Sequence, residues 1–200
     1  MANTKLTLDD ISDVRAYERE RAQFRDHVIR MKKLRRISIG PVVTVVFENR
    51  DTIRFQIQEM ARVEKMASDE QIQGELDVYN PLIPEPGELC ATLFVELTDE
   101  ASLREWLPKL VGVERAVILR LGVEPGSEVV RATPEQSHEE LLTRAEVTSS
   151  VHYLRFTLDE SQVERFGEGP VALAVDHPAY RHTCELGDDV RQELLGDLRP

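Results

Sequence analysis

The chain has 200 residues, of which 31% are charged and 41% hydrophobic, and its formal net charge is −12. This length can bury one large core or two small ones, and the composition is that of an ordinary globular protein. No apolar run approaches the roughly 18 residues of a membrane span, and the N-terminus lacks the basic and apolar regions of a signal peptide. We therefore expect a cytoplasmic protein that is not inserted in a membrane.

Positive charge is concentrated at the start of the chain. Residues 1–40 hold ten Lys and Arg against six Asp and Glu, whereas the remainder holds fifteen against thirty-one. A mainly acidic protein repels polyanions, so general nucleic-acid binding is not expected. The basic run Arg30–Arg36 is interpreted as the end of a helix, where cations complement the helix dipole. Contact with an anion or an acidic partner is the alternative.

The first predicted element is a long helix from Leu8 to about Arg36. Thr7 and Asp10 resemble a capping box at its start. One face carries an apolar stripe at spacings of three, four or seven: Leu8, Ile11, Val14, Tyr17, Phe24, Val28, Met31 and Leu34. Arg21 interrupts this stripe. Because such a helix spans about 45 Å, we predict that part of the stripe forms a homodimer seam, with Arg21 paired to an acidic group across it.

A hairpin and two helices are predicted next. Val42–Glu48 is β-branched and apolar, Asn49–Asp51 forms a turn, and Thr52–Ile57 alternates apolar and polar residues. A helix would follow from Gln58 to about Lys65. Its apolar face would carry Met60, Val63 and Met66. The second helix is predicted over Asp69–Tyr79.

The C-terminal half repeats one order of elements. Residues 89–142 and 151–195 each read strand, helix, strand, strand, helix, and Asp99-Glu100 aligns with Asp159-Glu160. In this alignment Phe94 is equivalent to Leu154. We predict an α+β fold with a long N-terminal helix, a hairpin–helix unit and two βαββα repeats in mostly antiparallel sheet. Residues 1–88 and 89–200 form either two regions or one single domain.

Polar side chains are densest where the predicted hairpin meets its helix. Glu48, Gln56, Glu59, Arg62 and Glu64 could converge there, where burial and charge would shift carboxylate pKa values. The loop that begins at Tyr79 and Asn80 adds a rigid, proline-rich wall. We predict that these residues bind a small polar ligand or a partner. The alternative is that Glu59 and Arg62 form a surface pair and that Gln56 faces water.

The second candidate is a metal site. His177, His182 and Cys184 lie close together in sequence, and His152 lies on the strand that opens the same repeat. Imidazole and thiolate are ligands for Zn or Fe. The spacing matches no familiar metal motif, and the alternative is that His177 hydrogen-bonds backbone at a turn.

Other catalytic motifs are absent from the sequence. It contains no GxSxG, GxGxxG or P-loop pattern, and no motif in it identifies a cofactor. Cys90 alternates within an apolar strand and is interpreted as a core thiol.

Several segments together resemble one protein family. The run FENRDTIRFQIQEMARVE, the preceding RRISIGP, the YNPLIP loop and the strands ELCATL and VHYLRF look like the pattern of bacterial domain-of-unknown-function family 3501. The resemblance covers nearly the whole chain. It implies an accessory or binding protein of peroxide or redox defence, acting beside rubrerythrin-like and iron–sulfur oxidoreductase proteins that would include its partner. The alternative function is a metal-dependent enzyme with a histidine or carboxylate site.

Overall fold

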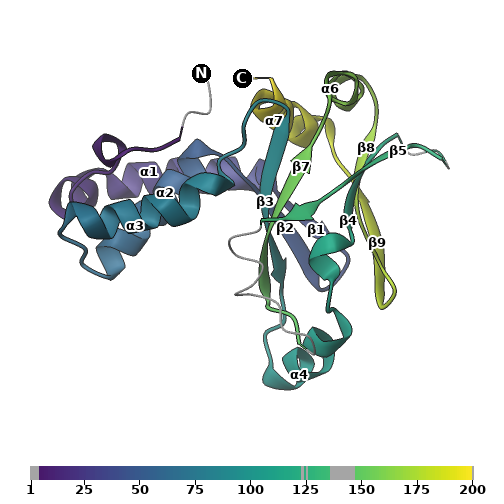
Figure 1. Ribbon diagram of the computed structural model, residues 1–200, viewed down its shortest axis with the longest axis horizontal. Helices are drawn as coiled ribbons and strands as arrows, with labels where there is room; N and C mark the ends of the chain where they lie inside the picture. The colour runs from purple at the N-terminus through teal and green to yellow at the C-terminus, as the bar shows by residue number, and fades with distance from the viewer. Residues whose placement is uncertain (1–4, 123, 125, 136–146, 200) are drawn as a thin grey trace.

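The computed structural model describes residues 5–122, 124, 126–135 and 147–199. Two antiparallel sheets form a β body, and three helices project from one side of it as an arm (Figure 1). The arm consists of α1 (Val14–Arg35), α2 (Arg50–Val63) and α3 (Asp69–Tyr79). No helix in the described ranges has both the length and the apolar character needed to cross a membrane.

The first helix begins later than predicted. The Thr7–Asp10 capping box is present, but it caps the N-terminus of only a short 3-10 helix, η1 (Leu8–Asp10). Asp13 then caps α1 by accepting a hydrogen bond from a backbone amide in the first turn of that helix. The predicted start at Leu8 is wrong because a second N-cap residue restarts the helix.

The segment predicted as the second hairpin strand, Thr52–Ile57, is helical and belongs to α2. Asn49 and Thr52 form a capping box at its start. Buried residues recur at a spacing of four, as Ile53, Ile57 and Ala61. This helical period outweighs the two-residue alternation. Val63, predicted on the buried face, is 65% exposed.

The hairpin lies earlier in the chain. β1 (Arg36–Ile39) pairs antiparallel with β2 (Val43–Glu48), and Gly40 between them has φ +73°. Every residue of β2 is buried, as its continuous apolarity predicts.

The remaining elements build the two sheets. The five-stranded sheet has the order β1-β2-β3-β7-β6, and the four-stranded sheet has the order β5-β4-β8-β9. The strands are β3 (Glu88–Val95), β4 (Val117–Leu121), β5 (Glu128–Arg131), β6 (Thr133–Pro134), β7 (Val151–Thr157), β8 (Val171–His177) and β9 (Tyr180–Glu185). The other helices are η2 (Asn80–Leu82), α4 (Glu100–Lys109), η3 (Val113–Arg115), α6 (Glu160–Glu168) and α7 (Asp188–Leu198). Strands from both sides of residue 88 therefore share one sheet.

Two apolar cores hold these layers together. The larger core lies in the β body and includes Phe47, Leu93, Leu119, Phe156 and Leu173. The smaller core lies in the arm and includes Ile53, Ile57, Leu76, Leu82 and Ile83.

Within the described residues both C-terminal units run strand, helix, strand, strand, as β3, α4, β4 and β5 and as β7, α6, β8 and β9, but the first unit also contains η3 and β6. The internal repeat therefore stays a prediction, and β4 of one unit pairs with β8 of the other at the centre of the four-stranded sheet. Leu119 of β4 lies opposite Leu173 of β8. At one end of this pair Gly122 N donates to Pro170 O, and at the other end Asp176 N donates to Ala116 O. The first unit's second helix is predicted over Pro134–Leu142; Pro134 belongs to β6, and residues 136–142 lie outside the described residues.

The predicted alignment within the repeat is shifted. Asp99 and Asp159 do occupy the same place, since each caps the helix that follows its strand. Phe94 and Leu154 nevertheless lie on opposite faces of the five-stranded sheet, because Leu154 belongs to the core and Phe94 lines an outer pocket. The longer connection between β3 and Asp99 changes the offset between the units.

The apolar stripe of α1 is partly buried within the same chain. Tyr17 and Val28 are 0% and 1% exposed, and α2 packs beside α1. Arg21 pairs with Glu59 of α2 rather than with a second subunit, at 2.7 Å. The stripe therefore does not require a homodimer.

Candidate ligand-binding site

A cavity of about 250 Å³ lies between the arm and the outer face of the five-stranded sheet. We call it the arm–sheet pocket. Both layers contribute to its wall, which is lined by Lys32, Glu48, Ile53, Gln56, Tyr79, Leu82, Thr92, Phe94, Val151 and Tyr153.

The sheet wall follows from strand alternation. Thr92 lies opposite Tyr153 and Phe94 lies opposite Val151 across the β3–β7 pair. Between them on β3, Leu93 faces the core. Because successive side chains point to opposite faces of a sheet, two aromatic rings, one hydroxyl and one aliphatic side chain are presented to the pocket.

The residues of the arm wall lie at or near the ends of the elements that contribute them. Glu48 is the last residue of β2, and the Asn49 cap turns the chain directly into α2. Gln56 then lies one turn beyond Ile53 on the same helical face. Lys32 comes from the last turn of α1 and Tyr79 is the last residue of α3.

The pocket holds groups of both charges. Glu48 is 7% exposed, and its Oε1 accepts a hydrogen bond from Thr92 Oγ1 at 2.7 Å. Within the described part of the chain, Lys32 forms neither an ion pair nor a hydrogen bond. Burial, followed by the nearby Tyr79 and Glu48, raises the pKa of Tyr153 to about 12. Tyr153 is therefore a neutral phenol at physiological pH.

Glu59 and Arg62, which the sequence grouped with Glu48, lie in a separate network between α1 and α2. Glu59 accepts hydrogen bonds from Tyr17 Oη at 2.7 Å and from Arg21 Nε at 2.7 Å. Arg62 Nη2 donates to the same carboxylate at 3.3 Å. The hydrogen bond from Arg21 is the main cause that lowers the pKa of Glu59 to about 2.

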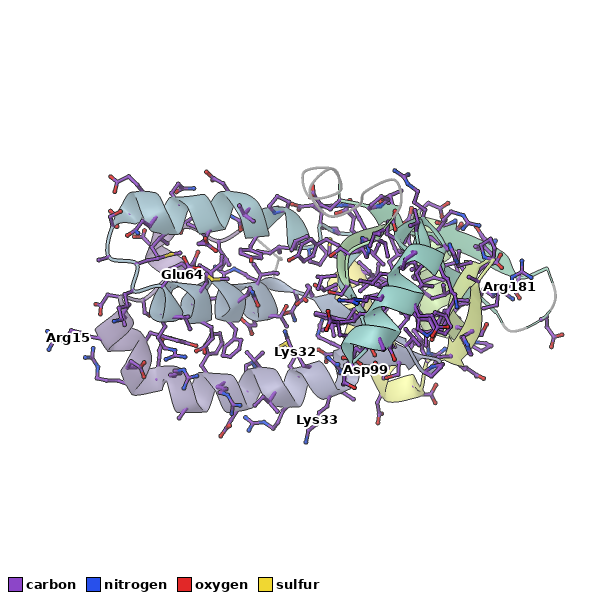
Figure 2. All side chains as sticks on the ribbon, turned by 90° about the horizontal axis from the view of Figure 1, so that it is seen from below. Arg15, Lys32, Lys33, Glu64, Asp99 and Arg181 are labelled. Carbon is purple, nitrogen blue, oxygen red and sulfur yellow. The ribbon has the colours of Figure 1, made fainter. Side chains whose placement is uncertain are left out.

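Glu64 and Asn80 lie outside the pocket wall. Glu64 is exposed at the end of α2 far from the sheets (Figure 2). Asn80 fixes the start of the chain, since its Nδ2 donates to Leu6 O at 2.9 Å and its Oδ1 accepts from Leu6 N at 2.8 Å. Of the predicted ligand-binding set, the structure brings together Glu48, Gln56 and Tyr79.

The predicted metal ligands occupy separate surroundings. The buried His152 ring lies within hydrogen-bonding distance of Thr148 Oγ1, at 2.8 Å. His177 Nε2 lies 3.0 Å from Val111 O. The His182 ring packs on Tyr180 with centroids 4.4 Å apart. Cys184 is half-buried on β9.

These four residues do not form a metal site in the structure. Among residues 5–122, 124, 126–135 and 147–199, no group of three or more His, Cys, Asp or Glu could hold a metal ion. The turn role considered for His177 agrees with its contacts, because its Nδ1 accepts a hydrogen bond from Ala179 N.

Sequence reasoning missed Lys32, Thr92, Phe94 and Tyr153 as pocket residues. The available signal was the face of β3 opposite its aliphatic residues, where Thr92 and Phe94 alternate with Ala91 and Leu93. The role of Lys32 could not be found this way, because its position at the pocket depends on how α1 packs against the sheet.

Comparison with known proteins places this architecture in a family. No curated protein matches the chain. A crystal structure described as a novel protein of unknown function from Burkholderia pseudomallei K96243 is similar, with a TM-score of 0.88 and 38% sequence identity over 98% of this chain and 100% of that one. The model of a family described as "Protein of unknown function (DUF3501)" matches residues 5–198. The chain therefore belongs to the DUF3501 family.

Proposed function

We propose that the protein binds a small polar molecule in the arm–sheet pocket. The observation that carries this proposal is Glu48, a carboxylate that is 7% exposed and lies on the pocket wall. Its one hydrogen-bond partner among the described residues is Thr92, which is neutral. Burying a carboxylate without a cation is unfavourable. A binding role would account for a buried carboxylate at this place.

The pocket's position and size support the same proposal. Ligand sites commonly form where two structural units meet and have mostly apolar walls with a few polar groups. The volume of about 250 Å³ lies just below the roughly 300–1,000 Å³ of pockets for drug-sized ligands. It suits a metabolite smaller than a nucleotide.

The proposal also includes a cellular role for the protein. The family resemblance implies an accessory role in peroxide or redox defence, beside rubrerythrin-like and iron–sulfur oxidoreductase proteins. A pull-down under reducing conditions tests this setting, and recovery of no oxidoreductase would remove it without affecting the pocket. A homodimer remains a separate prediction, tested by sedimentation, although Tyr17 and Val28 of the stripe on which it is based are already buried within the chain.

The metal-dependent enzyme is not retained as a second candidate. Its predicted ligands His152, His177, His182 and Cys184 each contact different neighbours, and the described residues contain no clustered set of three.

The proposal is tested by filling the pocket. Val151→Trp should place an indole over the pocket mouth, whereas Val129→Trp adds the same group to β5, where Val129 is 44% exposed and outside the pocket. A metabolite library is screened against both variants and the wild type by thermal shift, and hits are confirmed by native mass spectrometry. We expect at least one metabolite to bind the wild type and Val129→Trp but not Val151→Trp. Binding that is equal in all three proteins, or no binding at all, would overturn the proposal.

A further inference from the structure

The arm–sheet pocket contains an ammonium and a carboxylate that are not paired with each other. Lys32 and Glu48 both line it, yet no ion pair joins them within 4.0 Å, and Lys32 has no other charged partner in the described ranges. Figure 2 shows Lys32 on the side of α1 that faces the space between the arm and the β body, while Lys33 points away from it. The two charges therefore line one cavity without forming an ion pair with each other.

From this arrangement we infer that the ligand is a zwitterion of amino-acid size with an apolar side chain. The inference rests on the proposed function of the pocket. The ligand's carboxylate would meet Lys32, and its ammonium would meet Glu48, whose Oε1 is already oriented by Thr92. The apolar part would pack against Phe94 and Val151 of the sheet wall.

Charge arguments exclude the simpler ligand classes. A phosphorylated metabolite would bring two or more negative charges to one lysine, with Glu48 repelling it. A fatty acid would satisfy Lys32 and leave Glu48 buried beside apolar carbon, which is unfavourable. An aliphatic amine would leave Lys32 unpaired in the same way. A zwitterion satisfies both groups, and the pocket's formal charge is zero before and after it binds.

Neutral polar groups complete the site without changing this charge balance. Gln56 and Tyr79 add an amide and a phenol to the arm wall. Tyr153, whose pKa burial raises to about 12, adds a second phenol that keeps its proton. These groups can donate to a carboxylate or accept from an ammonium, so they reinforce either orientation of the zwitterion's head group.

Three matched probes separate the charge classes. Leucine carries both charges, 4-methylpentanoate lacks the ammonium, and isoamylamine lacks the carboxylate; phenylalanine, 3-phenylpropionate and phenethylamine form a second series with an aromatic side chain. Each probe is titrated calorimetrically into the wild type, Lys32→Met and Glu48→Gln, with Lys33→Met as the control on the outer side of α1. Thermal unfolding of each variant establishes that it is folded.

We expect one of the two amino acids to bind the wild type at least about tenfold more tightly than its single-charge analogues, since each analogue loses a charge-assisted hydrogen bond. Lys32→Met should weaken binding of the amino acid and of the carboxylic acid but not binding of the amine. Glu48→Gln should weaken binding of the amino acid and of the amine but not binding of the carboxylic acid. Lys33→Met should change none of them.

Other results have distinct meanings. If neither amino acid outperforms its analogues, the zwitterion inference is wrong, while a metabolite that Val151→Trp excludes would still uphold the pocket as a binding site. If the amino acid binds but both variants weaken every probe equally, Lys32 and Glu48 serve the fold alone, and the inference is again wrong. If amino-acid binding is unaffected by Val151→Trp, both the inference and the proposed function are overturned.

Discussion

Arg35, the last residue of α1, and Asp197, in α7, form a buried ion pair with two parallel hydrogen bonds. Arg35 Nη1 lies 2.7 Å from Asp197 Oδ2, and Nη2 lies 3.1 Å from Oδ1. Arg35 is 2% exposed and also donates from Nε to Glu193 at 2.9 Å. The pair ties the base of the arm to the C-terminal helix, and the arm–sheet pocket depends on that relative position.

Removing one partner of this pair should be strongly destabilising. Arg35→Met leaves Asp197 buried without its cation, and burial already raises the pKa of that carboxyl group. Breaking a buried pair in this way costs about 3–5 kcal/mol. We expect the free energy of unfolding, measured by urea titration at pH 7, to fall by that amount.

The neighbouring arginine supplies the control for Arg35→Met. Arg36 pairs with Glu96, and both side chains are nearly half exposed, so Arg36→Met should cost no more than about 1 kcal/mol. The double variant Arg35→Met/Asp197→Leu should recover part of the loss, because no charge then remains buried at that position. Equal losses for Arg35→Met and Arg36→Met would mean that the buried pair does not hold the arm.

The Glu59 network should make stability depend on acid pH. Hydrogen bonding, first from Arg21, lowers the pKa of Glu59 from 4.5 to about 2. A carboxyl group whose pKa is lower in the folded state contributes stability above its unfolded pKa and loses it as the pH falls towards the folded value. The shift corresponds to about 3 kcal/mol at pH 6, of which less than about half remains at pH 3.

Comparison with Glu59→Gln isolates this contribution. The difference in free energy of unfolding between the wild type and this variant should shrink from pH 6 to pH 3, as measured by urea titration at each pH. The sequence predicts Glu59 as a ligand-binding residue; because it lies between α1 and α2, we expect Glu59→Gln to destabilise the arm. A difference in free energy of unfolding that stays constant with pH would show that the Arg21 contact does not lower the pKa of Glu59.

The sequence predicts local elements well where one signal dominates. α3 was predicted over Asp69–Tyr79 and has those bounds, because Ser68 caps it and proline follows it. Thr52–Ile57 was predicted as a strand because Ile53, Phe55 and Ile57 alternate. The Asn49–Thr52 capping box was the stronger signal, since it satisfies backbone amides that only a helix leaves unpaired at its start.

The pocket could be predicted only in part. Glu48 and Gln56 were predicted from the density of polar residues around the junction of β2 and α2, and Tyr79 from the proline-rich loop that begins with it. Glu59 was grouped with them because it is close in sequence, yet it lies farther along α2, where it contacts Tyr17 and Arg21 of α1. Lys32 lines the pocket only because α1 packs beside the sheet, a tertiary contact with no local signature.

The two cysteines should differ sharply in reactivity. Cys90 is 1% exposed, and burial raises the pKa of its thiol to about 12. Cys184 is half-buried on β9. Because the thiolate is the reactive form, Ellman's reagent at pH 8 should titrate one thiol in the native protein and two in guanidinium chloride. Cys184→Ser should abolish the native reaction, whereas rapid labelling of that variant would show that Cys90 is accessible.

Tyr180 should stabilise the turn between β1 and β2 through its hydroxyl group. That group donates to Ile39 O at 2.6 Å and accepts from Val42 N at 3.0 Å and Val43 N at 3.2 Å. The residue is 3% exposed, so no solvent replaces these bonds when the hydroxyl is removed. Tyr180→Phe keeps the ring but removes the hydrogen bonds to Ile39 O, Val42 N and Val43 N. Ile39 and Val43 are also partners in the β1–β2 register, so the main loss falls on Val42 N, at a cost of about 1–3 kcal/mol for a buried group left without a partner.

We expect Tyr180→Phe to lower the free energy of unfolding by about 1–3 kcal/mol, the cost of one buried group left without a partner. Hydrogen exchange of the Val42 and Val43 amides should accelerate more than exchange within β3, since the loss is local to the turn. His182→Ala is the matched control, because it removes the exposed ring that packs on Tyr180 and leaves the hydroxyl in place. It should change stability by about 0.5 kcal/mol. Unchanged amide protection in Tyr180→Phe would mean that the β1–β2 pairing alone maintains the turn.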